Sequence, residues 1–147
     1  MSSYPREAIQ ILLVEDSPSD AELTIDALRS ARVLNEVHRV SDGVEALRFL
    51  RREGEHASAP HPDLILLDLN LPRMSGYELL ERIKGDEVLR ATPVIILTTS
   101  QAERDIARSY QLQANCYVSK PVDLQSFLDV VQHTGEFWLQ IVRLPQG

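Results

Sequence analysis

Short apolar runs recur along the chain and are separated by stretches with a helix-like pattern. The clearest runs are residues 11–14, 64–67 and 94–97, where four consecutive positions are apolar. Continuous apolar runs of this length are typical of strands that are buried on both faces of a parallel sheet. We therefore predict five strands, at residues 10–14, 36–40, 63–67, 93–97 and 115–119.

The segments between these strands carry signals for helices. Ser17 and Pro18 suit the N-cap and the first position of a helix that follows the first strand. Ser41, Asp42 and Gly43 turn into a second helix. Further helices are expected at residues 76–86, at about residues 102–112 and after Asp123.

The alternation of strands and helices predicts the fold. Right-handed crossovers between successive strands give a parallel sheet. We expect an α/β, doubly wound, five-stranded parallel sheet in the order 2-1-3-4-5, which is the flavodoxin-like arrangement. Residues 51–62 lack any periodicity and are predicted to form a mobile surface loop. The 147 residues suit a single domain, with its core at about residues 8–133 and a C-terminal helical extension at about residues 134–147.

Composition narrows the class of protein. The net charge of −7 disfavours nucleic acid and anionic membranes as partners, because both require a basic surface. The single cysteine, Cys116, cannot form an internal disulfide. We see no signal peptide and no apolar run of membrane-spanning length, so a cytoplasmic location is expected.

Polar side chains follow four of the predicted strands. Glu15 and Asp16 follow the first strand, Asp68 the third, Thr98 the fourth and Lys120 the fifth. In an open α/β sheet, ligands bind outside the carboxyl ends of the strands, so these side chains are expected to converge. Three carboxylates, a hydroxyl and an amine suit a divalent cation together with a phosphoryl group.

The chemistry expected of this group is phosphoryl transfer to a carboxylate. Asp68 can attack phosphorus and form an aspartyl phosphate. Such a reaction depends mainly on neutralising charge on the phosphoryl oxygens, which Mg²⁺ and Lys120 would do. Each residue alone has an ordinary explanation as a turn former or a helix cap. The prediction rests on the presence of all of them at adjacent strand ends.

The chain resembles the receiver domains of two-component response regulators. The matching residues are 11–16, 68–76, Thr98 and 117–121, and the resemblance covers about residues 8–133.

The resemblance implies a role for each residue of the site. It implies that Asp68 is the phosphoacceptor and that Mg²⁺, or Mn²⁺ as a substitute, is the cofactor. Asp16, Asp68 and the backbone carbonyl of Asn70 are implied to bind the metal, with Glu15 acting directly or through water. The expected protein is thus a signalling phosphoacceptor, without turnover beyond its own phosphoryl transfer and slow autodephosphorylation.

The resemblance also implies a switch. Thr98 is expected to move toward the phosphoryl group and to let Tyr117 turn inward. Simple packing of Tyr117 against the neighbouring helix is the alternative. A cis peptide bond is implied between Lys120 and Pro121.

The C-terminal residues indicate the type of receiver. Only enough residues for a final helix follow Pro121, so a stand-alone receiver is expected. The apolar tail either folds back on the core or meets another chain. The tail, the 51–62 loop and residues 70–74 resemble small receivers paired with cyanobacterial and bacterial phytochrome kinases. That resemblance implies a sensor histidine kinase, with a phytochrome as a candidate, and a homodimer through helix 4, strand 5 and helix 5. The candidate interface residues are Phe127, Val131, Phe137, Trp138 and Ile141.

Three other functions remain open at this point. A phosphohydrolase with an aspartyl nucleophile would need a second Asp where the chain has Asn70. A flavin-binding electron carrier would need a phosphate-binding loop after the first strand, where Glu15 and Asp16 would repel the phosphate. An interaction module that is never phosphorylated is the third.

Overall fold

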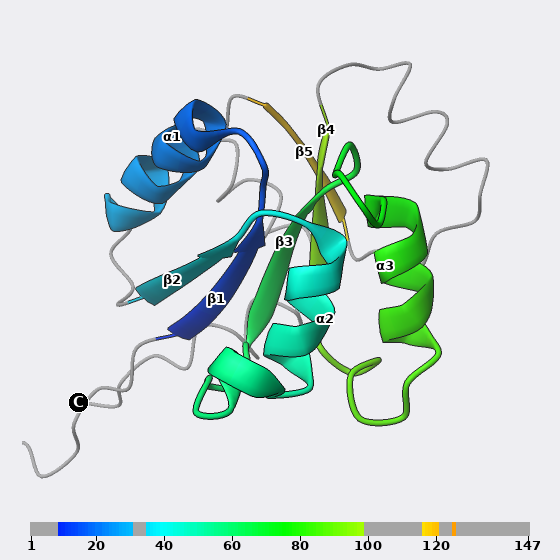
Figure 1. The fold of residues 1–147 in the computed structure, drawn as a ribbon. Coiled ribbons are helices and arrows are strands. Elements are labelled where there is room, and N and C mark those ends of the chain that lie inside the picture. Colours follow the sequence, from blue (N-terminus) through cyan, green and yellow to red (C-terminus); the bar gives the residue numbers. More distant parts are fainter. Residues whose placement is uncertain (1–8, 31–34, 99–115, 121–124, 126–147) are drawn as a thin grey trace, which may run out of the picture.

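The computed structural model describes residues 9–30, 35–98, 116–120 and 125. These residues form a five-stranded parallel sheet with the order β2-β1-β3-β4-β5 (Figure 1). The strands are β1 Ile9–Val14, β2 Asn35–Val40, β3 Leu64–Asp68, β4 Val94–Thr98 and β5 Cys116–Ser119. The predicted fold class and strand order are confirmed.

Helices cover both faces of the sheet (Figure 1). They are α1 Pro18–Arg29, α2 Gly43–Leu50 and α3 Gly76–Lys84, and Gly54–His56 adds one 3₁₀ turn, η1. The helix starts follow from the sequence. Ser17 caps α1, and Asp42 caps α2 by accepting a hydrogen bond from the amide of Glu45 at 2.8 Å. None of the helices within the described ranges is long and apolar enough to cross a bilayer.

Two apolar clusters explain the continuous hydrophobic runs. Along β1, Leu12 and Val14 pack into a cluster with residues of α2 and α3. Ile11 and Leu13 pack into a second cluster with residues of α1. Because successive side chains of a strand point to opposite faces, a strand covered on both faces must be apolar at every position.

Several predicted boundaries are wrong by one or two residues. β1 begins at Ile9 and β2 at Asn35, one residue before their predicted starts; residue 115, the predicted start of the fifth strand, lies outside the described part of the chain. The third strand spans Leu64–Asp68 rather than residues 63–67, and the fourth spans Val94–Thr98 rather than residues 93–97. Backbone pairing explains the third strand, because Asp68 is still in register with Leu97. The helix α3 ends at Lys84 rather than residue 86, with Gly85 as its C-cap.

The 51–62 segment is less irregular than predicted. It contains η1, and Arg52 and Gly54 adopt positive φ values of 55° and 58°. The ring of His56, at the end of η1, lies 5.4 Å from that of Phe49. Ala59 packs against the core cluster that contains Phe49. The segment therefore contains a 3₁₀ turn and a residue packed on the core, where we predicted only an irregular surface loop.

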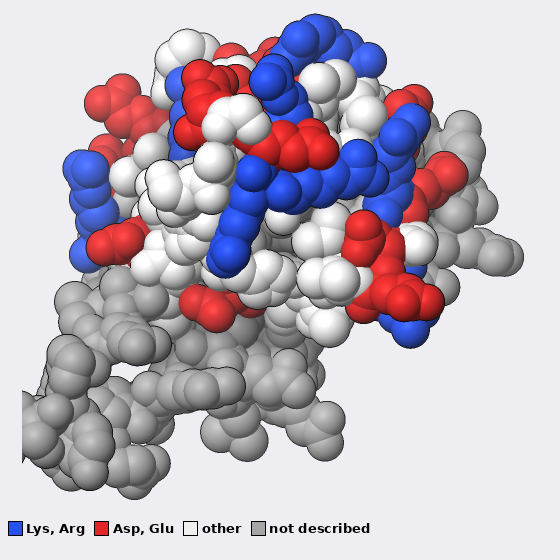
Figure 2. All heavy atoms as spheres, turned by 60° about the horizontal axis from the view of Figure 1, so that its bottom comes forward, with Lys and Arg blue, Asp and Glu red and all other residues white. Residues whose placement is uncertain are grey.

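Some predictions fall on residues outside the described ranges. These are the helix at 102–112, the extension at 134–147 and all of the final helix after Asp123 except Gln125, which is helical. On the described part of the face at the bottom of Figure 1, acidic and basic side chains are intermixed (Figure 2).

Candidate functional site

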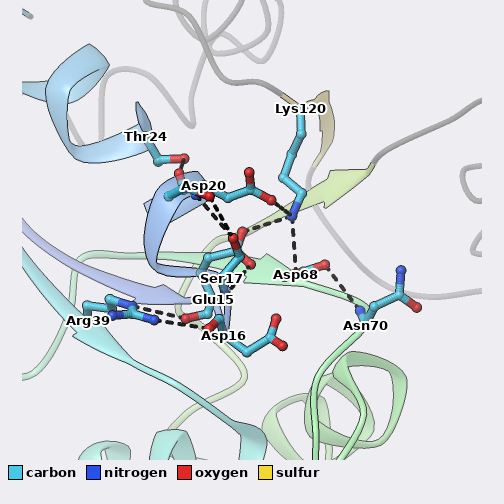
Figure 3. A network of polar contacts seen from close by, with 10 residues as sticks. Glu15, Asp16, Ser17, Asp20, Thr24, Arg39, Asp68, Asn70 and Lys120 are labelled. Atoms are coloured by element: carbon cyan, nitrogen blue, oxygen red, sulfur yellow. Dashed lines mark hydrogen bonds and ion pairs between the residues drawn. The ribbon is translucent and has the colours of Figure 1, made fainter. Parts of the chain in front are cut away.

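Three predicted carboxylates meet where β1 and β3 end side by side (Figure 3). Oxygen atoms of Glu15, Asp16 and Asp68 lie within 4.8 Å of one another. The side chains of Glu15 and Asp68 are only 0% and 4% exposed, whereas Asp16 is exposed. Two buried acids and one exposed acid thus share a small volume at the carboxyl edge of the sheet.

Lys120, at the end of β5, reaches into this group of acids (Figure 3). Its Nζ donates to Glu15 Oε1 at 2.9 Å, to Asp20 Oδ2 at 3.0 Å and to Asp68 Oδ2 at 3.3 Å. A lysine ammonium has three donors, so these contacts use all of them. The structure therefore places Lys120 where the sequence predicts it.

Asp20 is a residue that the sequence analysis missed. It lies in the first turn of α1, where an acidic residue is explained by the positive end of the helix dipole. No local pattern indicates its contact with a lysine 100 residues away. Only the topology indicates this contact, because α1 begins at the carboxyl edge of the sheet, where Lys120 also lies.

The charges of the site are not balanced. Burial alone would lower the pKa of Lys120, but its contacts with Glu15, Asp20 and Asp68 raise the pKa above its usual value and keep the amine charged. Burial first, and then the nearby Asp68 carboxylate, raise the pKa of Glu15 to about 7, although Lys120 opposes the shift. One ammonium thus faces more carboxylates than it can neutralise.

The donor set fits a divalent cation. Carboxylate and carbonyl oxygens are the ligands that Mg²⁺ prefers, and the site supplies Glu15, Asp16 and Asp68. The amide of Asn70 donates to Asp68 Oδ1 at 3.1 Å, which ties the chain after β3 to the same carboxylate. A cation between the acids would relieve the surplus of negative charge.

The Glu15–Asp16 segment is fixed by the neighbouring strand β2. Arg39 donates from Nε to the backbone oxygen of Glu15 at 3.0 Å and from Nη2 to that of Asp16 at 3.3 Å. The amide of Glu15 donates to the oxygen of Val40 at 3.0 Å. These bonds hold the backbone of both acids before any ligand binds.

The β3–α3 loop is held by a second ion pair, which we call the Arg73–Asp42 clamp. Arg73 Nε donates to Asp42 Oδ2 at 3.0 Å, and Nη2 donates to Oδ1 at 2.9 Å and to Oδ2 at 2.8 Å. Partial burial acts to raise the pKa of Asp42, but the Glu45 amide and Arg73 outweigh it and lower the pKa below its usual value. Arg73 has a positive φ of 64°.

Two glycines allow the loop to approach its neighbours. A Cβ on Gly76 would lie 2.5 Å from the backbone oxygen of Asp68. A Cβ on Gly43 would lie 2.6 Å from the backbone oxygen of Met74. Both distances are shorter than any normal carbon–oxygen contact. A side chain is therefore excluded at both positions, where the loop lies against β3 and α2.

The structure describes the backbone of the predicted switch residues but not their side chains. Thr98 is in register with Ser119, and Ile96 with Tyr117, which places Thr98 at the end of β4. The side chains of Thr98 and Tyr117 lie outside the described part of the chain. Pro121 of the predicted cis peptide also lies outside it, as do the proposed interface residues Phe127, Val131, Phe137, Trp138 and Ile141.

A second group of possible ligand atoms was not predicted. Ligand atoms of Glu45, Glu55 and His56 lie within 4.8 Å of one another, and His56 Nε2 is 3.7 Å from Glu55 Oε1. The carboxylates of Glu45 and Glu55 reach solvent, unlike those of Glu15 and Asp68. Water can therefore compensate their charge without a metal.

Comparison with known proteins identifies relatives of the chain. It is 44% identical over 135 residues to the response regulator Rcp1 of Synechocystis sp., which covers 92% of each chain. A solved Mn²⁺-bound form of Rcp1 has a TM-score of 0.73 at 43% identity and covers 94% of this chain and 99% of that one.

Two further solved structures are similar over nearly their whole length. The bacteriophytochrome response regulator AtBRR is 45% identical, with a TM-score of 0.83 over 90% of this chain and 96% of that chain. The phosphorylated cyanobacterial phytochrome response regulator RcpA is 46% identical, with a TM-score of 0.75 over 95% and 100% of the two chains. The family model of the response regulator receiver domain matches residues 11–132. The chain therefore belongs to the response regulator receiver family.

Proposed function

We propose that the protein is a response regulator that accepts a phosphoryl group from a histidine kinase onto Asp68. The observation that supports this most directly is the contact of Lys120 Nζ with Asp68 Oδ2 at 3.3 Å, beside the carboxylates of Glu15 and Asp16. A nucleophilic carboxylate, a fixed ammonium and a set of metal-binding oxygens are thereby combined at one sheet edge.

The proposed step exchanges one bond to phosphorus for another. An oxygen of Asp68 bonds to phosphorus while the phosphorus–nitrogen bond to the kinase histidine breaks. The imidazole nitrogen keeps the electron pair and takes up a proton. Lys120, already beside Asp68, would donate to a phosphoryl oxygen.

Mg²⁺ is the cofactor that we propose for this step. Glu15, Asp16, Asp68 and the backbone carbonyl of Asn70 would hold it, and Mn²⁺ would substitute. When bound, the cation neutralises charge on the transferring phosphoryl group. The three acids, two of them buried, support this assignment because their surplus charge favours a cation.

The signalling output that we propose is a change in a protein-interaction surface. Thr98 would respond to the phosphoryl group and Tyr117 would follow it. The kinase would be a phytochrome-type sensor, since AtBRR and RcpA are named as phytochrome response regulators, and the protein itself would be cytoplasmic. A homodimer through the helix predicted at about residues 102–112, β5, the helix predicted after Asp123 and the C-terminal tail completes the proposal.

Intact-mass measurement tests phosphoryl acceptance. The protein is incubated with Mg²⁺ and acetyl phosphate, and we expect the mass to rise by one phosphoryl group. Asp68→Asn should gain none, and removal of Mg²⁺ with a chelator should abolish the gain in the unchanged protein. Phosphorylation of Asp68→Asn would contradict the assignment, and rapid turnover of a phosphomonoester would favour a phosphohydrolase instead.

A further inference from the structure

The contact between Asp20 and Lys120 has no part in the phosphoryl transfer described above. We propose that Asp20 is a positioning residue that holds Lys120 in the resting site and competes with the phosphoryl group for its amine. This inference rests on the proposed phosphoryl acceptance at Asp68. It is drawn from the three contacts of Lys120 that Figure 3 shows.

The number of donors on Lys120 requires an exchange. Its three N–H groups are matched by Glu15, Asp20 and Asp68 at 2.9, 3.0 and 3.3 Å. A phosphoryl oxygen that binds Nζ must therefore replace, or share, one of these acceptors. The resting contacts of the lysine thus act against phosphoryl binding.

The exposure of the three acids indicates which contact breaks. The side chains of Glu15 and Asp68 are 0% and 4% exposed, but that of Asp20 is 42% exposed. A buried carboxylate that loses its partner has no water to replace it, which is costly. Asp68 avoids this cost only after its oxygen is bonded to phosphorus, and Glu15 only with a cation bound beside it. The carboxylate of Asp20 can be hydrated at every stage, so it is the acceptor that Lys120 gives up first.

The backbone of Asp20 is held within α1, whereas its side chain is 42% exposed and is bound at its tip by Lys120. Its amide donates to Ser17 Oγ at 3.3 Å, and its carbonyl accepts from Thr24 Oγ1 at 3.0 Å. Thr24 is buried within α1. The exchange therefore requires only rotation of a side chain at a fixed helix end, not a movement of α1.

The charge of Asp20 determines the direction of the effect. Asp20→Asn keeps the size of the side chain and both backbone bonds but removes the negative charge. Lys120 is then held less tightly, and a phosphoryl-like anion competes against one acid fewer. Because a partly exposed ion pair contributes little, we expect the affinity for such an anion to rise by about two- to five-fold.

Fluorine NMR with beryllofluoride and saturating Mg²⁺ measures this affinity directly. The unchanged protein is compared with Asp20→Asn and with Glu22→Gln, which removes an exposed carboxylate from the same helix that is not among the three partners of Lys120. We expect Asp20→Asn to bind the anion more tightly and Glu22→Gln to match the unchanged protein. Thermal unfolding of each variant checks that the fold is intact.

The outcomes separate this inference from the proposed function. Absence of bound fluoride signals in the unchanged protein would overturn phosphoryl acceptance, and the role of Asp20 with it. Normal binding in the unchanged protein with equal or weaker binding in Asp20→Asn would overturn only the role of Asp20. An equal gain in Glu22→Gln would also overturn it, because the effect would then come from the overall charge of α1 rather than from Lys120.

Discussion

Two ion-paired groups lie near the carboxyl edge of the sheet, and they differ in charge balance and exposure. In the first, one ammonium on Lys120 faces the carboxylates of Glu15, Asp20 and Asp68, and two of these acids are buried. In the Arg73–Asp42 clamp, one guanidinium is matched to one carboxylate, and the Arg73 side chain is 58% exposed. The charges of the clamp are balanced. In the first group, which we call the Lys120 group, the negative charges outnumber the positive one.

The comparison supports the proposed roles, in which the clamp serves stability and the Lys120 group serves ligand binding. Buried charges that are incompletely paired lower the stability of a fold, so stability alone does not explain the Lys120 group. A site that binds a cation needs an excess of negative charge before the cation arrives. The clamp has no surplus and fixes the loop after Asp68 against α2. The following changes test this division.

The largest effect is expected from Lys120→Met. It leaves the buried carboxylates of Glu15 and Asp68 without a cation, and we expect the free energy of unfolding to fall by about 3–5 kcal/mol. Urea denaturation at about pH 8 without divalent cations measures the loss. Added Mg²⁺ should restore part of it, because a bound cation replaces the missing charge.

Lys84→Met is the matched control for that loss. Among the residues that the structure describes, Lys84 Nζ donates to the backbone oxygen of Arg90 alone, at 3.2 Å, and burial lowers the pKa of its amine. Its replacement should cost much less than replacement of Lys120. Equal losses in the two variants would mean that the acids around Lys120 do not need its charge.

The second-largest effect is expected where the β3–α3 loop lies close to α2. Gly43→Ala would place a Cβ 2.6 Å from the backbone oxygen of Met74. We expect a loss of about 1–3 kcal/mol in unfolding free energy, because backbone atoms must move apart. Gly85→Ala is the control, since its nearest neighbour is 3.2 Å away and its φ of −84° suits alanine. If Gly85→Ala lost more unfolding free energy than Gly43→Ala, the loop at Met74 would have moved away from the new Cβ at little cost.

The sequence predicts the Lys120 group better than it predicts the clamp. Glu15, Asp68 and Lys120 each follow an apolar run, and the parallel order of the strands brings the ends of such runs together. The clamp joins residues 31 positions apart through an arginine with a positive φ. Neither the pairing nor that backbone conformation leaves a periodic pattern in the sequence.

The errors in the strand boundaries have a related cause. Apolar runs report where side chains are buried, whereas strands end where backbone pairing ends. Asp68 is polar but remains paired in register with Leu97, so the strand continues through the proposed phosphoacceptor. Asp20 was missed for another reason, because its partner Lys120 lies 100 positions later in the chain, directly after β5.

A smaller effect is expected when the clamp itself is removed. Asp42→Ala loses both the N-cap of α2 and the partner of Arg73, and should cost about 1–2 kcal/mol in unfolding free energy. Arg73→Ala loses only a largely exposed ion pair and should cost about 0.2–1 kcal/mol. Chemical denaturation of the two variants distinguishes the contributions. If Arg73→Ala cost more than Asp42→Ala, the clamp rather than the cap would determine the position of α2.

The smallest effect is the pH dependence of the clamp, measured with Asp42→Asn. Asparagine caps helices about as well as aspartate, so this change removes mainly the charge that Arg73 binds. The pKa of Asp42 is lowered below its ordinary value of 3.8 in the folded protein. The ionised carboxylate therefore stabilises the fold above about pH 4, and this contribution is lost as the pH falls through the lowered folded pKa. The difference in unfolding free energy between the two proteins should be constant near pH 6 and should shrink steadily below about pH 4. A difference that stayed constant down to about pH 2 would mean that the charge of Asp42 contributes nothing, and the clamp would then hold its loop by shape and neutral hydrogen bonds alone.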